Sequence, residues 1–277
     1  MEFTSGAAEQ RWTDLVAVAS RVVVGLDFDG TLSPIVDDPG RARIHPDAPA
    51  VLEELAGRVA AVAVITGRPA RQALALGGLD DVGRAIGDAG RELYVFGQYG
   101  SERWSSVDRR IVSPRPPRGL AAFLGALPGV LRQAGAAEAH VEEKGLAVAV
   151  HTRRLPDPAA AYDALLPRLQ VLAERHGMTL EPGRQVIEVR APGMDKGQVV
   201  RRLMSDLDAA GFLFAGDDLG DLDAFDAVEE LRERGVPTLL VCSVSEEESA
   251  LADRADVLVP GPEGVLDLLR ALTRETR

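Results

Sequence analysis

Residues 22–32 read Val-Val-Val-Gly-Leu-Asp-Phe-Asp-Gly-Thr-Leu. The apolar residues predict a buried strand that delivers two carboxylates, Asp27 and Asp29, and the Gly-Thr pair predicts a turn after them. Successive side chains of a strand point to opposite faces, so we expect Asp27 and Asp29 on one face and Phe28 on the other. Two adjacent carboxylates repel each other unless a cation or a proton lies between them. The stretch therefore indicates a metal site that contains a nucleophile.

Length and composition exclude several classes of protein. The 277 residues are 46% hydrophobic, which is enough for one large domain or two smaller ones. The net charge of −12 disfavours a nucleic-acid partner. No stretch has the length of a membrane span, and residues 1–11 lack the charged start and apolar centre of a signal peptide. A single cysteine, Cys242, fits a reducing compartment. We therefore expect a cytoplasmic protein with no membrane partner, and take a monomer as the working expectation.

Apolar runs of strand length alternate with segments of helical spacing. This alternation predicts an α/β fold with a doubly wound parallel sheet, a Rossmann-like core covered by helices on both faces. The expected strands are residues 22–27, 61–66, 93–96, 212–215, 238–242 and 257–259, and the expected helices are residues 48–58, 69–76, 199–209, 221–234 and 264–273. Active sites of such sheets lie beyond the carboxyl ends of the strands.

The middle of the chain has a different pattern. Prolines at positions 114, 116 and 117 mark a break, and Pro192-Gly193 closes the segment. Between them we expect helices at 120–134 and 158–176, and strands within 139–152, at 178–181 and at 186–190. We therefore predict a core formed by residues 1–112 and 193–277 and an inserted α+β cap domain at residues 113–192.

Polar residues follow a strand or begin a helix at four places. These are residues 27–31 (Asp-Phe-Asp-Gly-Thr), 66–68 (Thr-Gly-Arg), 194–197 (Met-Asp-Lys-Gly) and 216–221 (Gly-Asp-Asp-Leu-Gly-Asp). Each alone has an ordinary interpretation as a turn, a strand exit or a helix cap. Together, in a doubly wound sheet, they can converge on one edge and form a phosphoryl-transfer site.

Each stretch supplies a residue with a chemical role. Asp27 would attack phosphorus and form an aspartyl-phosphate. Asp29 would act as general acid and then general base, which contributes ~10²–10⁴-fold. The Thr66 hydroxyl would hold phosphoryl oxygens, and Lys196 would offset negative charge. Lys196 and Lys144 are the only lysines among 31 basic residues. For Lys196 this favours a need for a compact ammonium, whereas for Lys144 chance retention at a solvated position is an equal alternative.

The acidic residues also predict a magnesium site. Mg²⁺ prefers oxygen ligands in an octahedral arrangement and keeps several waters, so a few carboxylates suffice. The candidate ligands, acting directly or through water, are Asp27, Asp29, Asp217, Asp218 and Asp221.

The four stretches resemble those of the haloacid dehalogenase superfamily of phosphatases, before about Val112 and after about Pro192. The second acid, Asp29, points to phosphoryl transfer, because the dehalogenase members lack it. The insertion lies between the second and third stretches, where it resembles the α+β cap that supplies substrate selectivity in this superfamily.

A finer match covers the cap as well. Residues 26–35, 65–68, 99–102, 141–145, 147–153 and 183–190 resemble those of trehalose-6-phosphate phosphatases. The resemblance implies Mg²⁺-dependent hydrolysis of trehalose 6-phosphate to trehalose and phosphate. It also implies substrate contacts from Arg68, Glu102, Lys144, Arg184 and Glu188. Two departures are Gln98-Tyr99, where the family often has Asn-His, and Thr66, where it usually has serine.

Other functions remain open at this stage. The same fold could hydrolyse another sugar phosphate, such as sucrose phosphate or mannosyl-phosphoglycerate. It could also serve as a non-catalytic, sugar-phosphate-binding regulatory subunit, although the retained Asp27, Asp29 and Lys196 argue against this. A phosphomutase is disfavoured, because it must keep water from the intermediate and usually has a different cap.

Overall fold

The computed structural model describes residues 2–36, 38–183, 185–193, 195–244 and 251–276. The chain forms two compact units, which we call the core unit (Met1–Ser113 with Asp195–Arg277) and the inserted unit (Pro114–Met194). Each has its own sheet and its own apolar core. Across the described ranges, no helix has both the length and the apolar character that a membrane span requires.

One sheet organises the core unit. Its strands are β1 (Glu2–Phe3), β2 (Val22–Leu26), β3 (Ala61–Ile65), β4 (Leu93–Gly97), β5 (Glu102–Ser105), β10 (Gly211–Gly216), β11 (Thr238–Val244) and β12 (Val257–Pro260). Their order is β1-β12-β11-β10-β2-β3-β4-β5. The central strands, from β12 to β4, are parallel, and β1 and β5 pair antiparallel at the edges. Strands β2, β3 and β4 are buried along their whole length, as expected of parallel strands covered on both faces.

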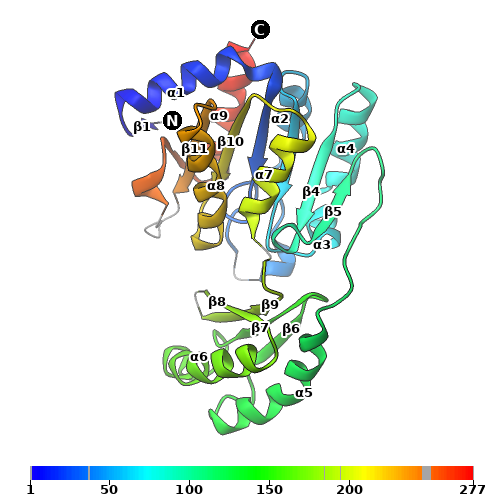
Figure 1. Ribbon diagram of the computed structural model, residues 1–277, viewed down its shortest axis with the longest axis vertical. Coiled ribbons are helices and arrows are strands. Elements are labelled where there is room, and N and C mark those ends of the chain that lie inside the picture. The colour runs from blue at the N-terminus through cyan, green and yellow to red at the C-terminus, as the bar shows by residue number, and fades with distance from the viewer. Residues whose placement is uncertain (1, 37, 184, 194, 245–250, 277) are drawn as a thin grey trace. The chain divides into compact units, whose positions relative to one another are not determined.

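Helices cover both faces of this sheet (Figure 1). Val22, Val24 and Leu26 of β2 belong to one apolar cluster, and Val23 belongs to the other. The first cluster includes residues of α1 (Gly6–Ala17), α2 (Ala48–Ala56), α3 (Ala70–Gly77), α4 (Leu79–Asp88) and α9 (Gly261–Glu275). The second includes residues of α7 (Lys196–Asp206) and α8 (Leu222–Glu233). The predicted doubly wound sheet is confirmed.

Short 3₁₀ turns connect several of these elements. They are η1 (Ala19–Arg21), η2 (Pro39–Arg41), η3 (Gln98–Gly100), η4 (Leu219–Asp221) and η5 (Ala252–Arg254).

Besides the two-residue edge strand β1, three helices and strands escaped the sequence prediction. Helix α4 has apolar residues at helical spacing, but Gly83 and Gly87 lower its helix propensity. Helix α1 buries only Ala8, Trp12 and Leu15, so its apolar stripe is narrow. Strand β5 reads Glu-Arg-Trp-Ser and has no apolar run, because it forms an edge.

The first motif also differs in one respect. Strand β2 ends at Leu26, one residue before Asp27. We had expected the alternation of strand side chains to orient the two aspartates, but both residues lie beyond the end of the strand. Asp27 is held by its N–H, which donates to the Ala215 carbonyl at 2.9 Å. Asp29 lies in a turn in which Leu32 and Ser33 donate main-chain hydrogen bonds back to the Phe28 carbonyl at 3.0 and 2.8 Å.

The inserted unit is a separate α+β structure. Its antiparallel sheet has the order β6-β7-β9-β8, formed by β6 (His140–Glu143), β7 (Ala147–His151), β8 (Thr179–Gly183) and β9 (Val186–Arg190). Helices α5 (Arg118–Gln133) and α6 (Pro158–Arg175) share an apolar cluster with Val148, Val150, Ile187 and Val189. The alternate residues of these strands, including Glu188 and Arg190, therefore lie on the opposite face of the sheet.

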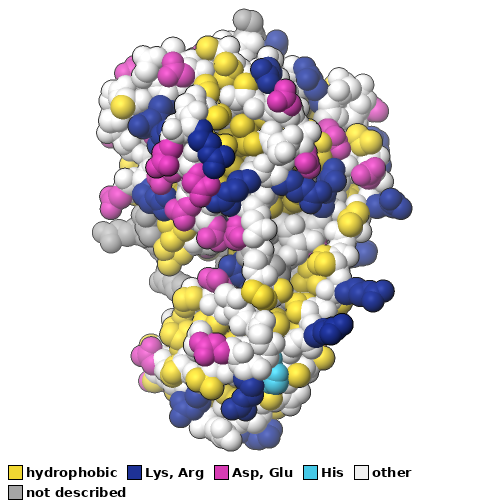
Figure 2. Space-filling view, viewed as in Figure 1, with side chains coloured by type: hydrophobic (Ala, Val, Ile, Leu, Met, Phe, Trp, Pro, Cys, Tyr) yellow, Lys and Arg dark blue, Asp and Glu magenta, His cyan; other side chains and the backbone are white. Residues whose placement is uncertain are grey.

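The net negative charge is not gathered into one patch on the face shown in Figure 2. Acidic and basic side chains are interspersed there over the core unit. One such pair joins α7 to α8, with Arg201 2.8 Å from Glu230, and another joins η5 to α8, with Arg254 2.6 Å from Asp226. An anionic ligand approaching this face meets local ion pairs rather than a uniform acidic field.

Candidate active site

The candidate site lies at the point where the strand order of the core sheet reverses. The chain passes from β2 to β3 and β4 on one side, whereas β10, β11 and β12 lie on the other. The loops that follow β2 and β10 therefore leave in opposite directions, which opens a crevice at their carboxyl ends. These two loops carry Asp27 and Asp217, and the Asp27 N–H donates to the Ala215 carbonyl at 2.9 Å.

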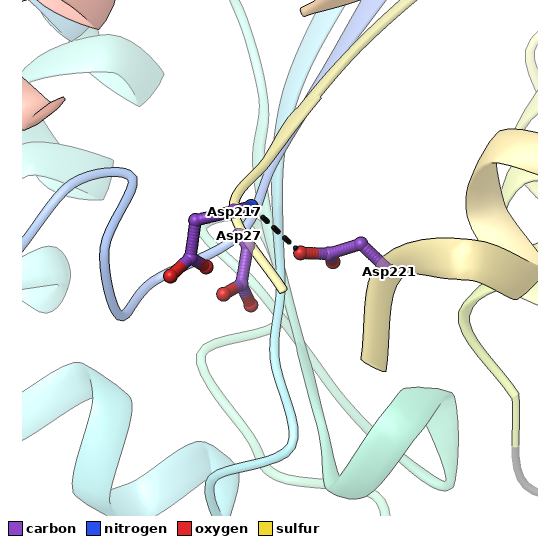
Figure 3. A group of neighbouring side chains, drawn as sticks. All are labelled: Asp27, Asp217 and Asp221. Carbon is purple, nitrogen blue, oxygen red and sulfur yellow. Dashed lines mark hydrogen bonds between the residues drawn. The ribbon is translucent and has the colours of Figure 1, made fainter. Parts of the chain in front are cut away.

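Three carboxylates meet in this crevice. Asp27, Asp217 and Asp221 each offer one oxygen, and these oxygens lie within 4.8 Å of one another. Figure 3 shows the carboxylates of Asp27 and Asp217 side by side, with Asp221 approaching from η4, at the start of α8. Asp221 accepts a hydrogen bond from the Asp217 main-chain N–H at 3.0 Å. Asp27 is 5% exposed and Asp221 is fully buried, so the cluster is largely removed from water.

Two glycines make room for these acids. Gly30 has a φ of +67°, and a Cβ at this position would lie 2.0 Å from Asp217 Oδ2. A Cβ at Gly216 would lie 2.4 Å from Asp221 Oδ2. Both distances are far below van der Waals contact, so a side chain at either position would displace a carboxylate of the cluster.

Lys196 supplies the positive charge of the site. It is the first residue of α7, which Asp195 caps by accepting from the Gln198 N–H at 2.7 Å. Its Nζ donates to Asp27 Oδ1 at 2.6 Å and to Asp221 Oδ1 at 2.7 Å. The lysine is 2% exposed, so the predicted charge partner of Asp27 is fully enclosed by the core unit.

The site holds more carboxylates than its one ammonium can balance. Burial raises the pKa of Asp27 and of Asp221 above the ordinary value, and Lys196 offsets only part of this effect. Burial, together with the charge of Asp27 and other acids, raises the pKa of Asp217 to about 10. Burial alone would lower the pKa of Lys196, but Asp221 and Asp27 raise it well above its usual range. The cluster therefore retains protons unless a further cation enters, and its oxygen donors could hold a metal ion.

Asp29 has a different cation as its partner. Arg68 Nε donates to Asp29 Oδ2 and Arg68 Nη2 donates to Oδ1, both at 2.6 Å. The family resemblance had implied that Arg68 contacts substrate; in this structure its guanidinium binds the Asp29 carboxylate. The two aspartates of the first motif are thus each neutralised separately, Asp27 by Lys196 and Asp29 by Arg68.

Other predicted residues hold the loops of the core unit. Thr66 is 1% exposed, and its Oγ1 accepts from the Arg68 N–H at 3.1 Å. Asp218 is exposed and caps η4 by accepting from the Gly220 N–H at 2.8 Å. Glu102 accepts from the Ala70 N–H at 2.7 Å, at the start of α3.

The inserted unit contains the chain's other lysine in a second ion pair. Lys144 Nζ donates to Glu188 Oε2 at 2.5 Å, and the two side chains are 15% and 8% exposed. Glu188 Oε1 is buried and has no hydrogen-bond partner among the described residues. Glu188 pairs in register with Ala149 on one side and Glu181 on the other. Arg184, which was predicted to bind substrate, lies outside the described residues.

Sequence reasoning missed two features that fix the loops. Gln98, Tyr99 and Gly100 have φ values of 47°, 56° and 97°, and such a left-handed run at residues other than glycine has no sequence signal. The Gln98 and Tyr99 N–H groups donate to the carbonyls of Arg68 and Thr66 at 2.8 and 3.0 Å. A serine directly after an apolar strand run is the only signal for the second feature: Ser243 Oγ of β11 donates to the Gly30 carbonyl at 2.6 Å.

Comparison with known proteins identifies the family of this chain. A family model described as trehalose-phosphatase matches residues 25–98 and 133–257. The chain belongs to the trehalose-phosphatase family. A trehalose-phosphate phosphatase of Mycolicibacterium paratuberculosis is 35% identical to this chain over 239 residues. The match covers 78% of this chain and 54% of the relative. The chain thus spans about half the length of that curated relative.

Solved structures show the fold of this trehalose-phosphatase family member. The C. albicans trehalose-6-phosphate phosphatase C-terminal domain matches with a TM-score of 0.76 and 19% identity, over 99% of this chain and 98% of that one. The Candida albicans trehalose synthase regulatory protein C-terminal domain matches with a TM-score of 0.69 and 12% identity. This match covers 96% of this chain and 97% of that one. Both a phosphatase and a regulatory protein share this haloacid dehalogenase-like fold. The side chains of the site must therefore decide between the two functions.

Proposed function

We propose that this chain hydrolyses trehalose 6-phosphate to trehalose and phosphate, with Mg²⁺ as cofactor. One observation carries the proposal: Asp27 is buried beside Asp217 and Asp221 and is paired with Lys196 at the switch point of the core sheet. A nucleophile, a cluster of oxygen donors and a fixed cation are what phosphoryl transfer requires. The family membership of the chain and the names of its relatives support the choice of sugar.

Asp27 and Asp217 would hold the Mg²⁺, and Asp221 would complete the cluster. The oxygens of Asp221 already accept from Lys196 and from the Asp217 main chain, so Asp221 also fixes the other groups in place. When bound, the ion supplies positive charge to the nucleophile and to the phosphoryl oxygens. Asp29 and Asp218 are engaged by Arg68 and by Gly220, and we leave them outside the direct ligand set.

The first displacement begins at Asp27. Lys196 binds Oδ1, which leaves Oδ2 as the attacking atom. A bond forms between Oδ2 and phosphorus while the bond from phosphorus to the sugar oxygen breaks. Asp29, protonated for this step, gives its proton to the departing sugar oxygen, and trehalose leaves.

The second displacement regenerates the enzyme. Asp29, now a carboxylate, takes a proton from a water whose oxygen attacks phosphorus. The bond from phosphorus to Asp27 Oδ2 breaks, phosphate leaves, and both aspartates return to their starting state. The Thr66 hydroxyl and nearby main-chain N–H groups would hold the phosphoryl oxygens in both steps.

The inserted unit would recognise the sugar. Lys144 and Glu188 offer a donor and an acceptor, and the unpartnered Glu188 Oε1 is an acceptor suited to a sugar hydroxyl. A polyol is distinguished from its analogues by such directed hydrogen bonds, because a missing hydroxyl leaves a buried polar group unsatisfied.

A regulatory role is the second candidate, and the fold shared with the trehalose synthase regulatory protein favours it. A phosphatase for another sugar phosphate is the third. A substrate panel with trehalose 6-phosphate, glucose 6-phosphate, sucrose 6-phosphate and mannosyl-3-phosphoglycerate separates these functions. We expect kcat/KM for trehalose 6-phosphate to exceed the others by at least ~10²-fold. Equal rates would overturn the choice of sugar, and binding without phosphate release would establish the regulatory role.

A further inference from the structure

The Arg68 side chain is fully engaged inside the core unit. Its Nε and Nη2 donate to the two oxygens of Asp29, and its Nη1 donates to the Pro39 carbonyl at 2.9 Å. The guanidinium carbon lies 5.4 Å from the centre of the Phe28 ring. Each guanidinium nitrogen thus has a partner in the chain, and the residue is only 9% exposed.

The Arg68 main chain is held as firmly as its side chain. The N–H donates to Thr66 Oγ1 at 3.1 Å, and the carbonyl accepts from the Gln98 N–H at 2.8 Å. Arg68 thus links the loop after β3 to the loop after β2. A side chain locked by packing and hydrogen bonds on every side is suited to orienting a neighbour.

Asp29 needs such a partner. It lies beyond the end of β2, and its side chain is 39% exposed, compared with 10% for Arg68. Without a partner, a carboxylate this exposed would rotate freely. A planar guanidinium that binds both of its oxygens fixes the plane of the carboxylate. A lysine could supply charge here but could not fix that plane, because its ammonium is a point donor.

We propose that Arg68 is a positioning residue that acts through Asp29 and does not itself bind the phosphoryl group. The inference rests on the proposed phosphatase function, in which Asp29 transfers the proton. It replaces the expectation that Arg68 binds substrate.

A double-mutant cycle on the full-length chain tests this role. Arg68→Met should lower kcat/KM for trehalose 6-phosphate by ~10²-fold, a large part of the general acid contribution. In an Asp29→Asn background the same change should lower it by less than about twofold, because the partner is already lost. The inhibition constant of inorganic phosphate should change by less than about threefold in both backgrounds.

The leaving group gives a second measurement. p-Nitrophenyl phosphate releases a stable phenolate that needs little protonation. Loss of Asp29 or of Arg68 should therefore reduce kcat/KM much less for this substrate than for the sugar phosphate. A general structural defect would reduce both equally.

Two further variants keep the cycle decisive. Arg71→Met alters an exposed arginine one residue into α3, and it should leave all rates unchanged. Arg68→Lys should retain charge but lose most of the activity, and it replaces Arg68→Met in the cycle if that variant does not fold by circular dichroism.

The outcomes separate this inference from the proposed function. Equal losses from Arg68→Met in both backgrounds, or a tenfold weaker affinity for phosphate, would show direct phosphate binding and overturn the positioning role alone. A wild-type chain that cleaves no phosphate monoester would overturn the phosphatase function and this inference with it.

Discussion

The two lysines of this chain lie in two units and make two different ion pairs. Lys196 in the core unit is 2% exposed and bridges Asp27 and Asp221. Lys144 in the inserted unit is 15% exposed and contacts Glu188, whose second oxygen has no partner in the described residues. The Lys196 ammonium is thus shared between two carboxylates, whereas Glu188 keeps one oxygen that can still accept a hydrogen bond.

This difference separates chemistry from recognition. A buried ammonium between two carboxylates cannot be exchanged for a ligand without leaving a buried charge unpaired. The Lys144–Glu188 pair has a free acceptor oxygen among the described residues, so it can bind a hydroxyl group without breaking the ion pair. In the proposed function, the core site would carry out the reaction and the inserted unit would select the substrate.

The largest effect is expected from Asp27. Asp27→Asn should lower kcat by at least ~10⁴-fold, because the nucleophile is lost while the shape of the side chain is retained. Phosphate release by excess enzyme and the far-ultraviolet circular dichroism spectrum are the measurements. Asp81→Asn, at a side chain that is 82% exposed, is the matched control. Activity that survives in Asp27→Asn would contradict the covalent mechanism.

Removal of the two lysines should have different effects. Lys196→Met should destabilise the fold by about 3–5 kcal/mol, because it leaves Asp27 and Asp221 buried without their partner. Lys144→Met should cost less stability, because it leaves one buried carboxylate, Glu188, without its partner rather than two. It should also lower kcat/KM for trehalose 6-phosphate by ~10-fold or more, with p-nitrophenyl phosphate unaffected.

Thermal unfolding and the two substrates together check this contrast. Arg132→Met, at an exposed arginine in the last turn of α5, is the control for Lys144→Met. Similar losses of stability in both lysine variants would remove the distinction between the two pairs.

The pH dependence of the metal-free protein sharpens the description of the core site. The folded pKa of Asp217, about 10, is far above the unfolded value of 3.8. Its stabilising contribution is therefore complete below pH 3.8 and is lost progressively as pH rises towards 10. Between pH 5 and 9, the unfolding free energy with chelator should fall by up to about 1.4 kcal/mol per pH unit from this group.

Asp217→Asn provides the comparison for this effect. The variant should show a flatter pH dependence in urea unfolding with chelator present. Addition of Mg²⁺ should stabilise the wild type at high pH and have little effect on the variant. If the unfolding free energies of the wild type and of Asp217→Asn had the same pH dependence, Asp217 would not be the group with the raised pKa.

The smallest effect is expected from Glu102. Because its carboxylate accepts from the first N–H of α3, Glu102→Gln should cost about 0.5–1 kcal/mol of stability. KM for the sugar phosphate should stay within about twofold of the wild type. A tenfold rise in KM with unchanged stability would instead make Glu102 a substrate ligand, as the resemblance implies.

Sequence periodicity was sufficient for the main strands and helices, because buried parallel strands are continuous apolar runs. It failed at α4, where glycines mask the apolar stripe, and at β5, an edge strand without such a run. The loops that carry Asp27, Thr66 and Asp217 were also predictable, because parallel strands place their carboxyl ends on one edge of the sheet.

The sequence by itself determined the doubly wound core and the inserted α+β unit, and it predicted the acids and the lysine of the candidate site. Only the tertiary structure decided which cation serves which acid. Lys196 meets Asp27 across 169 positions of sequence, and Arg68 meets Asp29 across 39. Local spacing encodes which face of a strand or helix a side chain occupies. It does not encode the distance between two loops, because packing of the whole sheet and its helices sets that distance.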